Sequence, residues 1–138
     1  MWCRPVAADG NCLFRAASVA LSGDYDLSAD EEDKRATELR RLVVVFMRNN
    51  RASFEGFLKD DVDFDQYTQT MQLPKEWGGE MELSAIARLT RRPVHVYTPP
   101  TEPRYEYVLL SQYPDATGAA RNAIRLLFHE RHYDALFE

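Results

Sequence analysis

Cysteine and histidine are scarce in this 138-residue sequence, which has only Cys3 and Cys12 and three histidines, at positions 95, 129 and 132. Two cysteines are too few for a disulfide scaffold, so an intracellular setting is expected: cytoplasmic or nuclear, or the host cytosol for a pathogen effector. The scattered histidines and cysteines form no recognisable zinc pattern. We therefore expect neither a metal nor an organic cofactor.

Long apolar runs and an excess of positive charge are missing as well. The longest purely apolar stretch, residues 42–47, is far shorter than the roughly 20 residues that cross a membrane, and no signal segment is visible at the start. Seventeen Lys and Arg against 22 Asp and Glu give a net charge of −5, so neither nucleic acid nor membrane is an expected partner. The length fits one domain, residues 1–138.

Hydrophobic periodicity divides the chain into a helical first two thirds and a strand-rich last third. Helical spacing of apolar residues predicts helices over 12–22, 28–50, 54–58, 64–71 and 83–89. Runs rich in β-forming residues predict strands over 93–97, 105–110, 123–128 and 132–137, with a turn-rich segment at 114–118. This order favours an α+β fold with a small, mostly antiparallel sheet packed between helices.

Cys12 is the residue whose surroundings suggest chemistry. It follows the turn sequence Asp9-Gly10-Asn11 and begins an apolar helix, where amides and the helix dipole favour a thiolate. Such a position, helped by an imidazole, can bring a thiol pKa from ~8.5 to about 3.5–7.5. The turn also lets amides from Asp9 to Cys12 point into one space, as in an oxyanion hole. On these residues alone, a buried structural cysteine after an ordinary capping turn is the simpler interpretation.

His132 and Asp134 supply a second candidate feature, because they are two residues apart in an expected strand. Side chains alternate across a strand, so both face the same side. Asp134 can then accept a hydrogen bond from one imidazole nitrogen while the other nitrogen faces a thiol, which is how a general base is oriented. The alternative is a surface histidine beside an exposed aspartate.

Together these features resemble the ovarian tumour (OTU) family of cysteine deubiquitinases. The resemblance rests on Asp-Gly-Asn-Cys-Leu-Phe-Arg-Ala at 9–16 and on His-Tyr-Asp at 132–134. The middle of the chain agrees in Trp-Gly-Gly at 77–79, Glu-Leu at 82–83 and the strand at 94–97. The similarity runs in order from about residue 4 to residue 137.

The resemblance implies an OTU-type cysteine-protease fold and an isopeptidase that cleaves ubiquitin, as single units or chains, from a lysine amine. Carried over by position, Cys12 is the nucleophile, His132 the base and Asp134 the residue that orients it. Asp9 counts with the catalytic residues, mainly by shaping the turn, and Asp9, Gly10, Asn11 and Cys12 form or support the oxyanion hole. Two alternatives stay open: a non-catalytic ubiquitin-binding module, and a cysteine protease for another ubiquitin-like modifier.

Three further places are candidates for the substrate channel. An extended Gly-Gly tail fits only a narrow, backbone-lined channel, and Trp77-Gly78-Gly79 is a candidate wall. A core tryptophan with glycines that allow close packing is the simpler interpretation of that segment. Tyr133 is expected to pack under the site, and His129 is a candidate channel residue for which no direct chemistry is expected.

Overall fold

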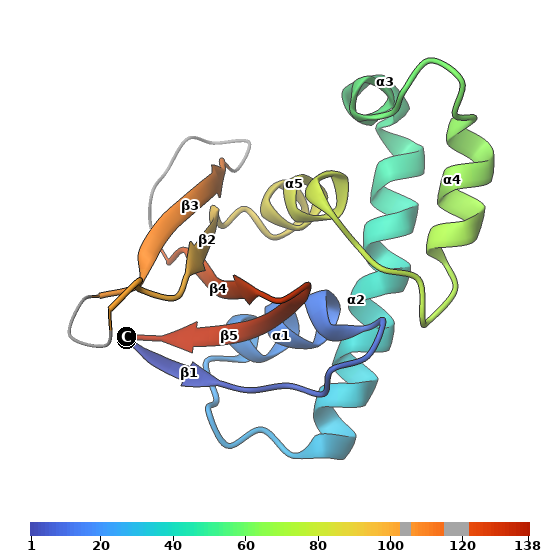
Figure 1. Cartoon of the computed structure of the whole chain (residues 1–138). Helices are drawn as coiled ribbons and strands as arrows, with labels where there is room; N and C mark the ends of the chain where they lie inside the picture. Colours follow the sequence, from blue (N-terminus) through green and yellow to red (C-terminus); the bar gives the residue numbers. More distant parts are fainter. Residues whose placement is uncertain (103–105, 115–121) are drawn as a thin grey trace.

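A single mixed sheet forms one layer of the molecule, as the computed structural model shows for residues 1–102, 106–114 and 122–138 (Figure 1). Its strands lie in the order β1-β5-β4-β2-β3. Their bounds are β1 Trp2–Arg4, β2 Val94–Thr98, β3 Val108–Tyr113, β4 Ile124–His129 and β5 His132–Phe137. Three pairings are antiparallel, and β2 pairs with β4 in parallel. The expected α+β fold with a mostly antiparallel sheet is confirmed.

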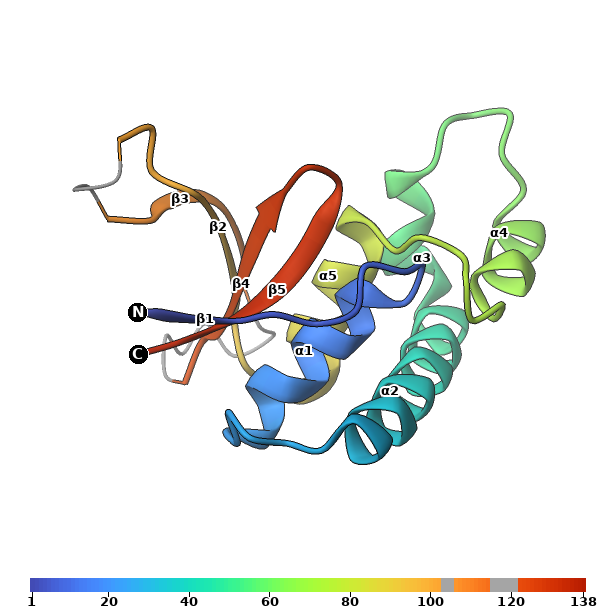
Figure 2. The same cartoon turned by 60° about the horizontal axis from the view of Figure 1, so that its bottom comes forward.

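The helices gather on one side of this sheet (Figure 2). Their bounds are α1 Cys12–Ser22, α2 Ala29–Asn49, α3 Arg51–Phe54, α4 Phe64–Met71 and α5 Glu80–Thr90, with a 3-10 turn at Glu55–Phe57. Helix α1 packs on β4 and β5 with one face and on α2 with the other. The sheet thus has the helices on one face rather than lying between helices, with α1 against β4 and β5 and α5 against β2 and β3 (Figure 2).

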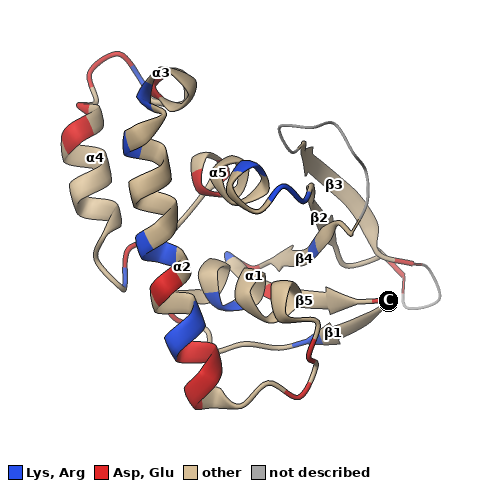
Figure 3. Cartoon of the chain, turned by 180° about the vertical axis from the view of Figure 1, so that it is seen from behind, with Lys and Arg blue, Asp and Glu red and all other residues tan. Residues whose placement is uncertain are grey.

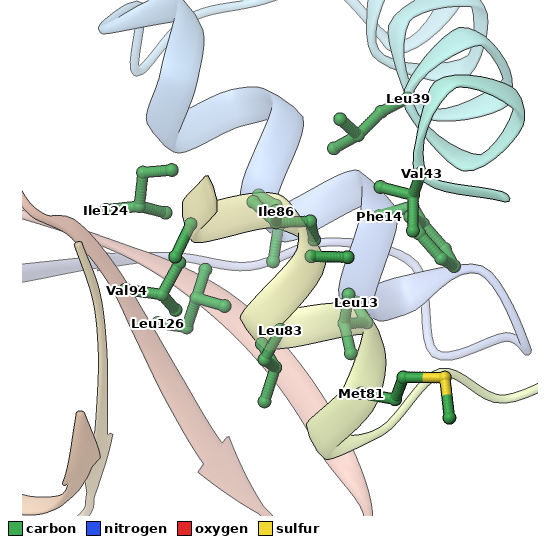
Figure 4. Close-up of a cluster of buried hydrophobic side chains, with 14 of the residues drawn as sticks. Leu13, Phe14, Leu39, Val43, Met81, Leu83, Ile86, Val94, Ile124 and Leu126 are labelled. Atoms are coloured by element: carbon green, nitrogen blue, oxygen red, sulfur yellow. The ribbon is translucent and has the colours of Figure 1, made fainter. Parts of the chain in front are cut away.

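The core explains this layering. Leu13 and Phe14 of α1, Leu39 and Val43 of α2, and Leu83 and Ile86 of α5 converge on strand residues such as Ile124 (Figure 4). Because α1 is apolar on both sides, it is buried as the central helix, and its first residue, Cys12, is held at a fixed place between sheet and helices.

Two strands differ from the sequence-based expectation. Residues 2–4 form β1, where the sequence predicted no strand; this strand exists because it pairs with β5 at the far end of the chain. Strand β3 begins at Val108 and continues to Tyr113, beyond the expected end at residue 110, because its polar half pairs with β2. Residue 105 and most of the expected turn at 114–118 lie outside the described residues.

The turn between β4 and β5 positions the first residue of β5. Glu130 and Arg131 both adopt positive φ, 51° and 62°, the backbone of a two-residue hairpin turn whose twist matches the strands. His129 and His132 therefore face each other across the hairpin. In the part of the chain that the structure describes, no helix is long and apolar enough to cross a membrane.

Candidate active site

Cys12 is the first residue of α1 and is 1% exposed. The backbone amides of Tyr133 and Leu13 lie near its sulfur and lower the pKa of the thiol. The Leu13 amide belongs to the first turn of α1, whereas the Tyr133 amide belongs to β5. The thiol therefore lies at the junction between the start of α1 and the strand that carries His132 and Asp134.

Burial raises the pKa of the Cys12 thiol above its ordinary value. The amides of Tyr133 and Leu13 lower the pKa, as expected at a helix start, but the carboxylates of Asp9 and Asp134 raise it further. The expectation of a depressed pKa from the helix start is therefore wrong for this structure. Desolvation of the anion outweighs the amides, and the sulfur rests as a thiol.

His132 and Asp134 face the same side of β5, as their spacing predicts. His132 Nε2 lies 2.6 Å from Asp134 Oδ1, and the same oxygen accepts a bond of 2.9 Å from the Val6 amide. The aspartate side chain is 8% exposed. Because the Val6 amide fixes the carboxylate from the opposite side, the carboxylate in turn fixes the imidazole ring.

This contact determines which imidazole nitrogen carries the proton. An ionised carboxylate only accepts hydrogen bonds, so Nε2 donates and the neutral ring keeps its lone pair on Nδ1. The Nδ1 atom of His132 is buried and has no hydrogen-bond partner among the described residues. His132 Nδ1 is therefore an open acceptor, and the next residue of β5, Tyr133, is the one whose amide lies near the Cys12 thiol.

The turn before Cys12 is held by its own aspartate. Asp9 Oδ1 accepts the Asn11 amide at 3.0 Å, and the Asp9 carbonyl accepts the Cys12 amide at 3.2 Å. Two amides expected to serve an oxyanion hole are thus engaged within the turn in this conformation. The Gly10 amide has no such bond among the described residues. These contacts give Asp9 the turn-shaping geometry that the sequence suggested.

Salt bridges tie the same turn to the start of α2, where acidic and basic residues follow one another (Figure 3). Arg15 lies 3.3 Å from Asp9 Oδ2 and 2.8 Å from Asp33 Oδ1. Glu32 lies 3.7 Å from Arg15 and 2.8 Å from Arg4. The network joins Arg4, the last residue of β1, to the turn before Cys12 and to the start of α2.

A cleft of about 790 Å³ opens between the start of α5, β3 and the β4–β5 hairpin, and neither Cys12 nor His132 lines it. Its walls include Trp77, Gly78, Gly79 and Tyr133, four of the five candidate channel residues. Tyr133 relates the cleft to the nucleophile candidate, because Tyr133 lines the cleft and its amide lies near the Cys12 sulfur. Leu110, Ser111 and Tyr113 of β3 form part of the opposite wall.

Two expectations about the channel need correction. Trp77 is 53% exposed, so the core-tryptophan interpretation is wrong; Gly78, however, does pack closely, since a Cβ there would lie 3.2 Å from Leu13 Cδ1. His129 does not line the cleft, whereas its neighbour Phe128 does. Successive residues of a strand point to opposite faces, which takes His129 away from the channel.

Glu82 holds the glycine segment of the channel in place. Its carboxylate accepts the Gly79 amide at 2.7 Å and the Tyr67 hydroxyl at 2.8 Å. Burial raises the pKa of this carboxyl, while the same two donors lower it. In the sequence, Glu82 stands out only through the resemblance and as an acidic residue within the apolar face of a predicted helix.

Arg40 is the main contributor that the sequence analysis did not single out. It is 3% exposed, and its guanidinium donates to Asn11 Oδ1 at 2.9 Å and to the Gly10 carbonyl at 3.2 Å. It also donates to the carbonyls of Met71, Pro74 and Glu76. A signal was present, since position 40 lies on the apolar stripe of α2 between Ala36 and Val44.

Comparison with known proteins identifies the class to which this fold and site belong. The family model for OTU-like cysteine proteases matches residues 7–134. The chain therefore belongs to the OTU-like cysteine protease family. The match includes the turn before Cys12 at one end and Asp134 at the other.

Individual relatives agree with this assignment. The chain is 39% identical over 92 residues, 67% of its length, to the OVARIAN TUMOR DOMAIN-containing deubiquitinating enzyme 7 of Arabidopsis thaliana. It is 29% identical over 139 aligned residues, 98% of its length, to deubiquitinating enzyme 6 of the same plant. It spans only 22% and 24% of these two proteins.

Solved structures show the same fold. The OTU domain of OTUD1 superposes with a TM-score of 0.74 at 24% identity, over 99% of this chain and 85% of that one. An OTU domain solved in complex with ubiquitin superposes with a TM-score of 0.69 at 22% identity, over 96% of this chain and 67% of that one.

Proposed function

We propose that this chain is a single OTU-type catalytic domain that hydrolyses the isopeptide bond between the C-terminal glycine of ubiquitin and a lysine amine. The observation that carries the proposal is that the buried Cys12 thiol lies at the start of α1, which packs against β5, the strand that carries His132. The Nε2 atom of His132 is bound by Asp134, and its Nδ1 atom is open.

The proposed reaction is acyl transfer. His132 Nδ1 takes the thiol proton as the Cys12 sulfur attacks the glycine carbonyl, and the protonated imidazole then gives that proton to the leaving lysine amine. Water, deprotonated by the same nitrogen, cleaves the thioester. Asp134 keeps the ring oriented and stabilises the imidazolium.

The oxyanion requires donors from the turn at residues 9–12. The hydrogen bond from the Cys12 amide to the Asp9 carbonyl is long, at 3.2 Å, compared with 3.0 Å for the bond from the Asn11 amide. A small change in the turn would therefore break the Cys12 bond first and free this amide for the oxyanion. The Gly10 amide is the second donor in this proposal. Each such donor is worth ~10²–10³ in rate.

The cleft fits the substrate that the relatives' names indicate. Two plant relatives are described as deubiquitinating enzymes, and one similar OTU domain was solved with ubiquitin. A Gly-Gly tail has no side chains, and Gly78 and Gly79 offer a wall without side chains, with Trp77 exposed at its edge. We place this reaction inside cells, in cytoplasm, nucleus or host cytosol, because the chain has two cysteines and neither is in a disulfide.

A ubiquitin probe with an electrophilic C-terminus tests the proposal. Wild type should form a covalent adduct that mass spectrometry maps to Cys12, and Cys12→Ala should form none. Cys3→Ala is the matched control and should react normally. His132→Ala should slow labelling by ~10²-fold or more.

The same assay distinguishes the alternatives. A domain that binds ubiquitin but never reacts with the probe is a binding module. Reaction with a probe built on another ubiquitin-like modifier, and not with ubiquitin, assigns a different substrate. Unchanged labelling of His132→Ala removes the histidine from its role as base.

A further inference from the structure

Arg40 is a buried cation held without a carboxylate partner. Among the described residues no acidic oxygen lies within salt-bridge distance of its guanidinium, and its partners are the Asn11 amide oxygen and four carbonyls. Its Cζ also lies 4.4 Å from the centre of the Phe14 ring. Burial lowers the pKa of Arg40, and the more distant carboxylates of Glu82, Glu76 and Asp9 act in the opposite direction, so the direct contacts of the charge are all with uncharged oxygens and the Phe14 ring.

The carbonyls that Arg40 binds belong to two separate segments. Gly10 and Asn11 form the turn before Cys12, whereas Met71, Pro74 and Glu76 lie on the segment that leads from α4 to the cleft. The two segments touch, because a Cβ at residue 10 would lie 2.0 Å from the Lys75 carbonyl oxygen. The guanidinium is therefore the clamp between the turn and the segment that leads to Trp77.

The clamp fixes the direction of a peptide group. A trans peptide is planar, and its C=O and N–H point in opposite directions. Since Arg40 draws the Gly10 carbonyl toward α2, the Asn11 amide must point away from α2, toward the Asp9 carboxylate. Without the guanidinium, the Gly10–Asn11 peptide would keep only the bond from its amide to Asp9, and glycine permits backbone conformations that other residues rarely adopt.

We propose that Arg40 is a positioning residue for the oxyanion hole: it holds the turn at residues 9–12 in the orientation that presents backbone amides to the reacting carbonyl. The inference rests on the proposed function of this site. Arg40 itself touches neither the Cys12 sulfur nor the substrate and acts through Gly10 and Asn11.

Ubiquitin aldehyde provides a readout specific to this role. The Cys12 sulfur forms a bond to the aldehyde carbon, the C=O double bond becomes a single bond, and the thiol proton passes through His132 to the new oxygen. The oxygen of this hemithioacetal occupies the oxyanion position. Affinity for the aldehyde thus depends on the oxyanion amides, whereas affinity for ordinary ubiquitin does not.

Arg40→Lys is the informative variant, with Arg41→Lys as its matched control. Lysine keeps the charge but lacks the planar fork that reaches both segments. Arg41 is the next residue of α2, with a side chain 60% exposed. We expect Arg40→Lys to weaken ubiquitin aldehyde binding and to lower kcat by ~10²-fold each, with KM and binding of ordinary ubiquitin within about threefold of wild type. Arg41→Lys should match wild type throughout.

The outcomes separate the two proposals. Wild type that fails to react with ubiquitin aldehyde refutes the proposed function itself. A reactive wild type with an equally reactive Arg40→Lys overturns the role of Arg40, as does a variant that loses both ligands in parallel. If Arg40→Lys does not stay folded, Asn11→Ala decides, because it removes the oxygen that Arg40 holds while leaving Arg40 its carbonyls. A selective loss of aldehyde affinity then supports the role, and unchanged affinity overturns it.

Discussion

Replacing Asp134 by alanine and by asparagine separates the two things that its carboxylate does. One oxygen, Oδ1, accepts from both His132 Nε2 and the Val6 amide, at 2.6 and 2.9 Å. Alanine removes this acceptor, whereas asparagine keeps an oxygen in the same place. The pair of variants therefore distinguishes loss of the acceptor from loss of the charge.

The magnitudes follow from the two bonds. Leaving a partly buried amide unpaired costs ~1–3 kcal/mol, and a hydrogen bond to a charged group contributes ~1.5–3 kcal/mol. Allowing for non-additivity, Asp134→Ala should lower the free energy of unfolding by about 2–4 kcal/mol, and Asp134→Asn by about 1 kcal/mol. The alanine variant also frees the imidazole, so labelling by the ubiquitin probe should fall by ~10²-fold, against less than ~10-fold for asparagine.

Urea unfolding and the rate of probe labelling measure both quantities. Glu138→Ala is the control, because this carboxylate is also on the C-terminal segment but is 71% exposed; its unfolding free energy should stay within about 0.5 kcal/mol of wild type. Equal losses in Asp134→Asn and Asp134→Ala would show that the charge, and not the shared acceptor oxygen, holds the histidine.

Two further predictions test the surroundings of the site. Gly10→Ala should cost about 1–3 kcal/mol of stability and slow labelling by the ubiquitin probe, because its methyl group would meet the Lys75 carbonyl. The control Gly56→Ala, whose methyl group would meet nothing within 4 Å, should change neither quantity. Equal free energies of unfolding in urea for the two variants would mean that the Lys75 segment moves freely. Burial and the neighbouring Asp134 carboxylate raise the pKa of Cys3 from 9.0 to about 11, so the stability gained by keeping a neutral thiol is present below pH 9 and lost as the pH rises toward about 11. Unfolding free energy measured across that window should fall more steeply in wild type than in Cys3→Ala, and parallel profiles would refute this.

The elements that the sequence predicted well are those with local signals. Helix α1 begins at Cys12 and ends at Ser22, and Gly23 adopts a left-handed φ of 69°, as expected for a glycine that ends a helix. The side chain of Ser28 caps α2 by accepting the Glu31 amide. In contrast, β1 has three residues and owes its existence to a partner more than 130 residues away. No local pattern encodes such a pairing.

The same distinction applies to the site. Strand alternation was enough to predict that His132 and Asp134 face one side, and their 2.6 Å contact confirms it. The Val6 amide that fixes Asp134 lies 128 positions away and carries no sequence signal. Arg40 had a local signal, a charge on the apolar stripe of α2, but the pattern did not indicate that its partners lie in the turn before Cys12 and in the segment after α4.

The largest change concerns how the Cys12 thiol becomes a nucleophile. The position at the start of α1 was expected to favour the thiolate, yet burial raises the thiol pKa although the amides of Tyr133 and Leu13 lower it. On the proposed mechanism, the thiol proton therefore leaves only when a base is in place to accept it and the sulfur attacks the substrate at once. The open Nδ1 of His132 is such an acceptor. The carboxylates of Asp9 and Asp134 further disfavour a free thiolate, so in the absence of substrate the buried sulfur should react slowly with small alkylating agents at neutral pH.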